Sequence, residues 1–174
     1  MNAKLGITLV AFLALAGLGP QVSAQSRPSD TAAAQRFIGA WRLVSWVQDM
    51  ADGTQRPGST ADRGYIMYTP DGRMCAVLQN MKRPKWTGPA ASVEEANARL
   101  SGAVSYCAAV EVHADEGFVL HTVDLDFNPG SVGLVRKRWF NFDGPDRLIL
   151  RVDRNELRAD VKESRLVWER VPRK

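Results

Sequence analysis

Short runs of alternating polar and apolar residues, separated by tight-turn sequences, dominate this chain from residue 40 onward. A period of two places successive side chains on opposite faces of a strand, so each run predicts a half-buried β-strand. Turn sequences such as Pro70-Asp71-Gly72 join neighbouring runs into antiparallel pairs. The predicted strands are 40–48, 64–69, 74–79, 108–113, 118–127, 132–142, 147–153 and 165–171. Many short antiparallel strands at close spacing indicate a sandwich or a closed barrel.

One segment departs from this period. Residues 92–101 place Val93, Ala96 and Leu100 on one helical face. Ser92 and Glu95 have the spacing of a capping box, in which each side chain accepts a hydrogen bond from the backbone N–H of the other residue. We therefore expect an all-β fold with one short helix, inserted between strands as a lid or as a plug of the barrel.

The first 24 residues have the organisation of a signal peptide. Lys4 gives a positive start, residues 7–18 are almost entirely apolar but too few to span a bilayer, and Val22-Ser23-Ala24 offers small residues for cleavage. We expect a periplasmic or secreted protein whose mature chain starts at Gln25. Residues 25–36 are expected to be a flexible leader, and residues 37–172 to form one domain.

The charge of the mature chain is small and well mixed. Lys4 is removed with the signal peptide, so 22 Lys and Arg remain against 19 Asp and Glu, a net charge of +3. Nucleic-acid-binding domains carry a longer basic stripe with interleaved aromatic residues, so we expect no nucleic-acid partner. The basic stretch 82–85 beside Trp86 is too short for an amphipathic anchor, and we do not expect membrane contact.

If the chain is exported, its two cysteines are in an oxidising compartment, where a disulfide can persist. Cys75 and Cys107 both alternate out of phase with apolar neighbours such as Met74 and Ala108, so both are predicted to point to the outer face of the barrel. Their strands are joined by the helical segment and can lie side by side. The sequence leaves two possibilities open, a disulfide or two free thiols.

The start of the first strand carries a recognisable motif. Gly39-Ala40-Trp41 is the Gly-x-Trp of lipocalin and wider calycin barrels, and the runs 37–45, 64–74 and 166–170 resemble the bacterial lipocalin-like domain family. The resemblance extends over roughly residues 37–171 and implies a single up-and-down antiparallel β-barrel. It also implies that Trp41 closes one end of the barrel with Arg170 stacked on its indole ring. The alternative is that Trp41 is an ordinary core residue and Arg170 a solvated charge.

His121 and Arg138 are the main candidate site residues. His121 shares its strand face with apolar residues at every second position. Arg138 shares its face with Leu134, Arg136, Phe140 and Phe142, and the two phenylalanines indicate that this face also points into the barrel. If the intervening turn centres between Pro129 and Gly130, the two side chains lie nearly opposite each other across a hairpin. Asp124 and Asp126 fall on the other face and are predicted to be solvated. A buried arginine needs an anion, carbonyl oxygens or water as a partner.

Three interpretations of these residues remain open. In the first, protein groups satisfy Arg138, His121 is a hydrogen-bonded core residue, and the barrel is a filled structural domain without a ligand. In the second, which is our main prediction, His121, Arg138 and Tyr68 form the polar end of a pocket for a small apolar, anionic molecule. In the third, His121 is a general acid or base of an isomerase or lyase, and Arg138 or Tyr68 stabilises an oxyanion.

Other kinds of site have little support in the sequence. The two histidines, His113 and His121, are not accompanied by spaced cysteines or a carboxylate cluster, so we expect no metal site. A haem bound through the single inward-facing His121 would lack a second supporting feature. The chain also has no glycine-rich phosphate loop and no nucleophile elbow, and we expect no cofactor.

Overall fold

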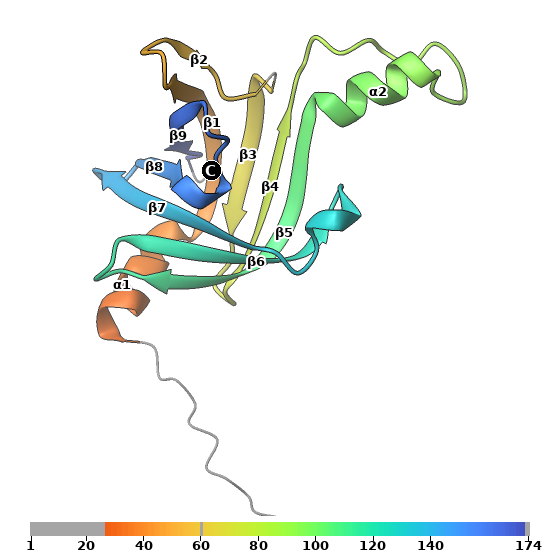
Figure 1. The fold of residues 1–174 in the computed structure, drawn as a ribbon. Helices are drawn as coiled ribbons and strands as arrows, with labels where there is room; N and C mark the ends of the chain where they lie inside the picture. The colour runs from red at the N-terminus through yellow and green to blue at the C-terminus, as the bar shows by residue number, and fades with distance from the viewer. Residues whose placement is uncertain (1–26, 60, 173–174) are drawn as a thin grey trace, which may run out of the picture.

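Eight antiparallel strands pair in chain order, and the last pairs with the first, so the sheet closes into an up-and-down barrel (Figure 1). The computed structural model describes residues 27–59 and 61–172. The barrel strands are β1 (Gly39–Met50), β3 (Arg63–Tyr68), β4 (Arg73–Gln79), β5 (Ala103–His113), β6 (Phe118–Asp126), β7 (Val135–Asp143), β8 (Arg147–Val152) and β9 (Val161–Arg170). A further short strand, β2 (Gln55–Pro57), pairs with β1 at its margin.

This architecture confirms the predicted lipocalin-like barrel and all eight predicted strands. β2 was not predicted, because three exposed residues carry no alternation. β5 and β9 begin earlier than predicted, at Ala103 and Val161. Small residues at the start of β5 and charged residues at the start of β9 hide the period of two there. The core inside the ring includes Trp41, Ile66 and Trp168, each at most 2% exposed.

The prediction of a single helix was wrong, because the expected flexible leader over 25–36 contains a second one, α1 (Pro28–Phe37). Pro28 lies in the first turn, where its missing N–H costs nothing, and the acidic Asp30 complements the helix dipole. Residues 32–34 are alanines, which have the highest helix propensity. The segment has no strong apolar stripe, so its polar and small composition resembled that of a linker.

Contacts with the barrel fix α1 across one end of the ring (Figure 1). A carboxylate oxygen of Asp30 accepts a hydrogen bond of 2.7 Å from the Ala114 N–H at the β5–β6 turn. At the other end of the helix, Phe37 is 1% exposed and its ring lies 4.9–5.0 Å from the rings of Tyr68, Phe140 and Phe142. We call this end of the barrel the closed end.

Trp41 and Arg170 complete the closed end in the arrangement that the family resemblance implies. Trp41 is fully buried and its indole N–H donates to Phe37 O at 2.7 Å. The Arg170 guanidinium carbon lies 4.0 Å from the centroid of the indole ring. A Cβ at residue 39 would lie 3.1 Å from Arg170 Nη1, and φ there is +125°, so a glycine is needed beneath the stacked pair.

The predicted helix is present as α2 (Val93–Ser101), with both hydrogen bonds of the capping box. Ser92 Oγ accepts from the Glu95 N–H at 3.2 Å, and Glu95 Oε2 accepts from the Ser92 N–H at 2.7 Å. The expectation of a lid or plug was wrong, because α2 projects away from the ring between β4 and β5 (Figure 1). No helix in the described part of the chain is long and apolar enough to cross a membrane.

Cys75 and Cys107 are joined in a disulfide. They are directly paired residues of β4 and β5, so the bond links two neighbouring strands of the barrel wall. Of the two possibilities that the sequence left open, the structure contains the disulfide.

Candidate functional site

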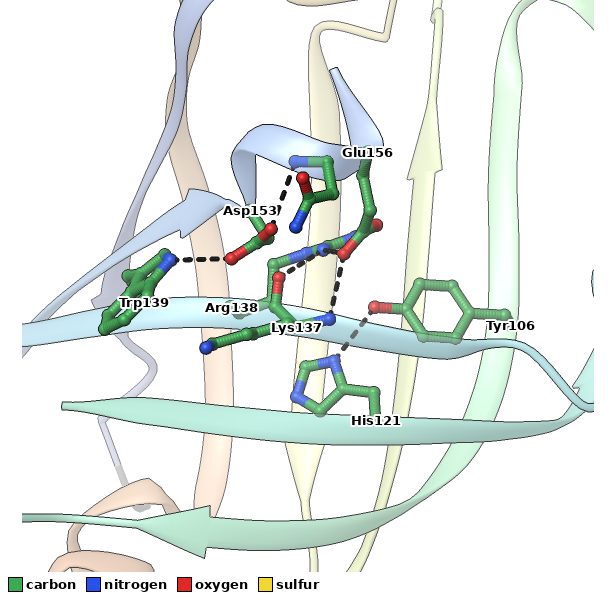
Figure 2. A network of polar contacts seen from close by, with 8 residues as sticks. Tyr106, His121, Lys137, Arg138, Trp139, Asp153 and Glu156 are labelled. Carbon is green, nitrogen blue, oxygen red and sulfur yellow. Dashed lines mark hydrogen bonds and ion pairs between the residues drawn. The ribbon is translucent and has the colours of Figure 1, made fainter. Parts of the chain in front are cut away.

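His121 lies on β6 with its side chain fully buried inside the barrel. Tyr106 Oη, from β5, is 3.2 Å from its Nδ1 (Figure 2), and Tyr68 Oη, from β3, is 3.2 Å from its Nε2. We call these three residues the Tyr–His–Tyr row. The sequence predicted inward positions for His121 and Tyr68 but missed Tyr106, because the predicted strand began only at residue 108.

Burial governs the protonation of the row. Together with the charges of Arg138 and Arg136, it lowers the pKa of His121 to about 3. Burial also raises the pKa of Tyr68 well above its usual value, and raises that of Tyr106. At neutral pH the row therefore consists of one neutral imidazole and two protonated hydroxyls.

The row has more donors than it can use. A neutral imidazole offers one N–H and one acceptor nitrogen, and each hydroxyl has one proton, so three protons serve two hydrogen bonds. One tyrosine donates to the bare nitrogen, while the other accepts from the imidazole N–H and keeps its own proton. Neither hydroxyl makes another hydrogen bond to the described residues. Among the described residues, one buried hydroxyl donor is therefore left without an acceptor.

Arg138, on β7, has a protein carboxylate as its partner. Its side chain is 11% exposed, and Nη1 donates at 2.7 Å both to Glu156 Oε1 and to Lys137 O (Figure 2). Glu156 belongs to η2 (Arg154–Glu156), a short 3-10 helix between β8 and β9, and also accepts from the Lys137 N–H at 2.9 Å. The guanidinium nitrogens Nη2 and Nε donate to no acceptor within the described residues. Strand periodicity could not reveal Glu156, because it lies in a turn.

The predicted pairing of His121 with Arg138 was wrong. Arg136 is the residue opposite His121, and Arg138 lies opposite Val119. The prediction centred the turn between Pro129 and Gly130, whereas the observed pairs are centred one residue earlier, between Asn128 and Pro129. The connection contains the 3-10 helix η1 (Pro129–Ser131), and β7 begins only at Val135. His121 and Arg138 still lie close enough for the arginine charge to act on the imidazole.

Arg136 adds a second guanidinium beside the row. Its guanidinium carbon lies 4.9 Å from the centroid of the Tyr106 ring, and Nη2 donates to Asp126 Oδ2 at 3.1 Å. Its Nε atom is buried and has no hydrogen-bond partner among the described residues. We call the Tyr–His–Tyr row, Arg136, Arg138 and their carboxylates Asp126 and Glu156 the polar cluster.

Asp126 was predicted to face solvent, but its side chain is only 8% exposed. A β-bulge explains the difference. Cys107 of β5 pairs with Leu125 and Ala108 pairs with Val123, so Asp124 is an extra residue on β6. An extra residue reverses the alternation beyond it. Leu125 consequently faces outward, and Asp126 turns inward toward Arg136.

A pocket of about 920 Å³ lies at the end of the barrel opposite α1, which we call the open end. Leu43, Trp46 and Met50 give it an apolar wall, while Lys82 and Arg158 bring positive charge to its lining. In an up-and-down barrel, the end of β1 and the start of β7 lie at the same end. Arg136 and Arg138 are therefore in the half of the barrel nearer this opening.

A second pocket of about 690 Å³ lies at the closed end, between α1 and the β3, β4 and β5 strand ends. Phe37, Val110 and Val112 contribute apolar surface. Tyr68 also lines this pocket, and its hydroxyl belongs to the Tyr–His–Tyr row. Tyr68 is the one residue of the polar cluster among the lining residues of these two pockets.

In the described part of the chain, no group of three or more His, Cys, Asp or Glu side chains is arranged to hold a metal ion. The second histidine, His113, lies at the end of β5, where its ring stacks on Phe118 with centroids 4.4 Å apart.

The chain was compared with protein families, curated proteins and solved structures. It matches one family and is similar to several solved β-barrels. The family model described as a lipocalin-like domain matches residues 38–171. No curated protein matches the chain. Among solved structures, a redesigned β-barrel is similar at 10% identity and a TM-score of 0.42, with 80% of this chain and 96% of that chain covered. A de novo designed fluorescence-activating β-barrel is similar at 14% identity and a TM-score of 0.40, with 80% and 97% covered.

Proposed function

Because the chain belongs to the lipocalin-like domain family, we propose that it binds a small apolar, anionic molecule inside its barrel. The observation that carries the proposal is the shortage of acceptors in the polar cluster. One tyrosine hydroxyl and Arg136 Nε are buried and have no protein acceptor among the described residues. Buried donors are normally paired. A ligand carboxylate would supply the missing acceptor oxygens and would form charge-assisted hydrogen bonds.

The pockets at the two ends of the barrel provide room for the rest of such a molecule. Small-molecule sites typically measure about 300–1,000 Å³ and combine apolar walls with a few convergent polar groups. The pockets of about 920 and 690 Å³ fall in this range. We therefore assign the apolar body of the ligand to one of these pockets and its anionic group to the polar cluster.

Arg138 is the proposed contact for the anionic group. Glu156 occupies one side of its guanidinium through Nη1, which leaves Nη2 and Nε for a second acceptor. Arg136 and Arg138 are each paired with one carboxylate, so the cluster has excess donors but little excess charge. The proposed ligand adds the acceptor that the cluster lacks, in addition to Glu156.

Two alternatives to ligand binding are an isomerase or lyase and a structural barrel filled by its own side chains. The enzyme is the weaker of the two. A general base works best when its pKa is close to the operating pH, and the pKa of His121 is about 3. We therefore propose binding rather than an isomerase or lyase reaction. The Arg138–Glu156 ion pair is also what a filled barrel would contain, and that alternative differs from ours in its response to mutation.

Removal of the whole Arg138–Glu156 pair tests the proposal. Arg138→Met alone would leave the Glu156 carboxylate without its partner and cost about 1–3 kcal/mol of stability, which would obscure a binding effect. In the double variant Arg138→Met/Glu156→Gln, both charges are removed together. We expect its affinity for a fluorescent fatty-acid probe to fall about tenfold or more, since a hydrogen bond to a charged group contributes about 1.5–3 kcal/mol.

A surface ion pair provides the matched control. Arg151 and Glu163 lie 3.4 Å apart on β8 and β9, and both side chains are more than a third exposed. Arg151→Met/Glu163→Gln should bind the probe as the wild-type protein does. Unchanged probe affinity in the Arg138→Met/Glu156→Gln protein, with its fold intact, would support the filled barrel instead.

We also propose that the protein acts after export. Residues 1–24, which carry the expected signal peptide, lie outside the described residues, and the support comes from the Cys75–Cys107 disulfide, a bond favoured in oxidising compartments. N-terminal sequencing of exported material should begin at Gln25. Material that keeps residues 1–24 and stays with the membrane would contradict this.

A further inference from the structure

Exposed apolar side chains gather on two neighbouring connections at the open end of the barrel. On the β4–β5 connection they include Trp86, Val93 and Leu100, and around the β6–β7 turn they include Phe127, Val132 and Leu134. The Arg99 guanidinium carbon lies 5.7 Å from the ring centroids of both Trp86 and Phe127, so it joins the two groups. We call these six apolar residues, together with the cations Lys82, Lys85 and Arg99, the rim surface. Large exposed apolar patches mark interaction sites more often than chance.

Helix α2 is the most prominent part of the rim surface. It projects from the barrel (Figure 1), and its apolar residues Val93 and Leu100 are 80% and 60% exposed. Most helices owe their stability to packing of an apolar face, and a helix this short is marginal alone. Within residues 27–59 and 61–172, the apolar side of α2 therefore lacks the partner surface that such a helix normally has.

The charges on the β4–β5 connection are mainly positive at the surface. Lys82, Lys85 and Arg99 are exposed, whereas the carboxylate of Glu95 is turned inward to the N–H groups of Ser92 and Thr87. Around the β6–β7 turn, Asp126 is buried against Arg136. Glu94 is the exposed acidic residue of α2. The rim surface thus combines exposed apolar side chains with a net positive charge.

We propose that the rim surface docks on an anionic lipid bilayer. Aromatic and aliphatic side chains enter the boundary between headgroups and acyl chains, and lysine side chains pair with anionic headgroups. The sequence argued against membrane contact, because the basic stretch 82–85 alone is too short to anchor the protein. The fold changes this argument by placing α2 and the β6–β7 turn on the same rim as that stretch.

A second copy of the chain would be a poorer partner for this surface. Twofold-symmetric association brings the same patch of both copies together, so Lys82, Lys85 and Arg99 would face their own counterparts. Like charges across an interface oppose association. An anionic bilayer instead matches both the apolar and the positive character of the rim. Docking would direct the open-end pocket toward the bilayer, but the inference does not depend on the proposed ligand.

Vesicle co-sedimentation tests the proposal with the chain that starts at Gln25, which retains every described strand and helix. Vesicles of phosphatidylcholine with phosphatidylglycerol should bind the protein, and vesicles of phosphatidylcholine alone should bind it at least tenfold less. Each of the substitutions Lys82→Gln and Lys85→Gln should weaken binding about fivefold. The triple variant Trp86→Ser/Val93→Ser/Leu100→Ser should lose most of the binding that remains in high salt.

The outer wall of β3 and β4 offers a matched control. Tyr65, Met67 and Val77 are also exposed apolar residues, at 37–44%, but they lie on barrel strands and not on the two rim connections. Tyr65→Ser/Met67→Ser/Val77→Ser should bind vesicles as the wild-type protein does. Absence of binding to anionic vesicles, or equal loss in both triple variants, would overturn the proposal. So would a dimer in sedimentation velocity that dissociates in the rim variant, because a second copy would then cover the surface.

Discussion

A neutral histidine buried between two tyrosines makes the stability of the barrel depend on pH. Below pH 6.5 the histidine of the unfolded chain binds a proton, while folded His121, with its pKa of about 3, stays neutral. The unfolded state then binds more protons, so stability falls as the pH falls from 6.5 toward 3. Below about pH 3 the histidine is protonated in both the folded and the unfolded state, so its contribution to stability no longer changes with pH.

His121→Gln should remove this part of the pH dependence. Between roughly pH 7 and pH 5 the wild-type protein should lose about 2 kcal/mol more of its free energy of unfolding than the variant does. Urea unfolding of both proteins at the two pH values measures the difference. Parallel losses in the two proteins would mean that His121 is protonated inside the barrel at pH 5.

Tyr68 and Tyr65 lie on the same strand and test the hydrogen bonds of the row. Tyr68→Phe leaves a ring nitrogen of the buried His121 without its partner, which should cost about 1–3 kcal/mol of stability. Tyr65 is 43% exposed, and Tyr65→Phe should change stability by less than about 0.5 kcal/mol. Urea unfolding of the two variants checks this, and equal effects would contradict the buried row.

The sequence predicted which side chains point inward but not which side chains they contact. The alternation correctly placed His121 and Arg138 in the barrel. Their partners depend on features that alternation does not encode, namely the centre of the β6–β7 turn, the bulge on β6 and the 3-10 helix that carries Glu156. The acceptor shortage becomes visible only when these contacts are known.

At the scale of elements, strands and the capped helix could be predicted because their signals are local. A strand repeats every two residues, and the capping box of α2 lies within four residues. α1 was missed because its position depends on tertiary contacts, above all the insertion of Phe37 among three aromatic rings of the barrel. Isolated helices of this length are marginal in water, so their sequences need little helix signal of their own.

Phe37→Ala tests whether α1 is an integral part of the barrel. Loss of this buried ring should leave a cavity and lower the free energy of unfolding by about 3–5 kcal/mol. Phe127 is 42% exposed on the rim, and Phe127→Ala should cost less than about 1 kcal/mol. Chemical denaturation of the two variants measures both values. A small effect at Phe37 would show that α1 is a dispensable extension.

The two ends of the barrel differ. α1, Trp41 and Arg170 cover the closed end. The open end combines the larger pocket with the rim surface. The sequence predicted the closure of the ring through the family resemblance and its strand pattern. It could not predict the difference between the ends, because that depends on where α1 and α2 lie relative to the ring.

The proposed site selects an apolar molecule by its anionic group, and two ligands that share one apolar chain separate the contribution of that group from that of the chain. Decanoate and decanol share the same apolar chain, but only decanoate offers a carboxylate to the polar cluster. Isothermal titration of the wild-type protein should show decanoate bound about tenfold tighter or more, as expected for at least one added charge-assisted hydrogen bond. Equal affinity for the acid and the alcohol, or heat from neither, would contradict the proposed site.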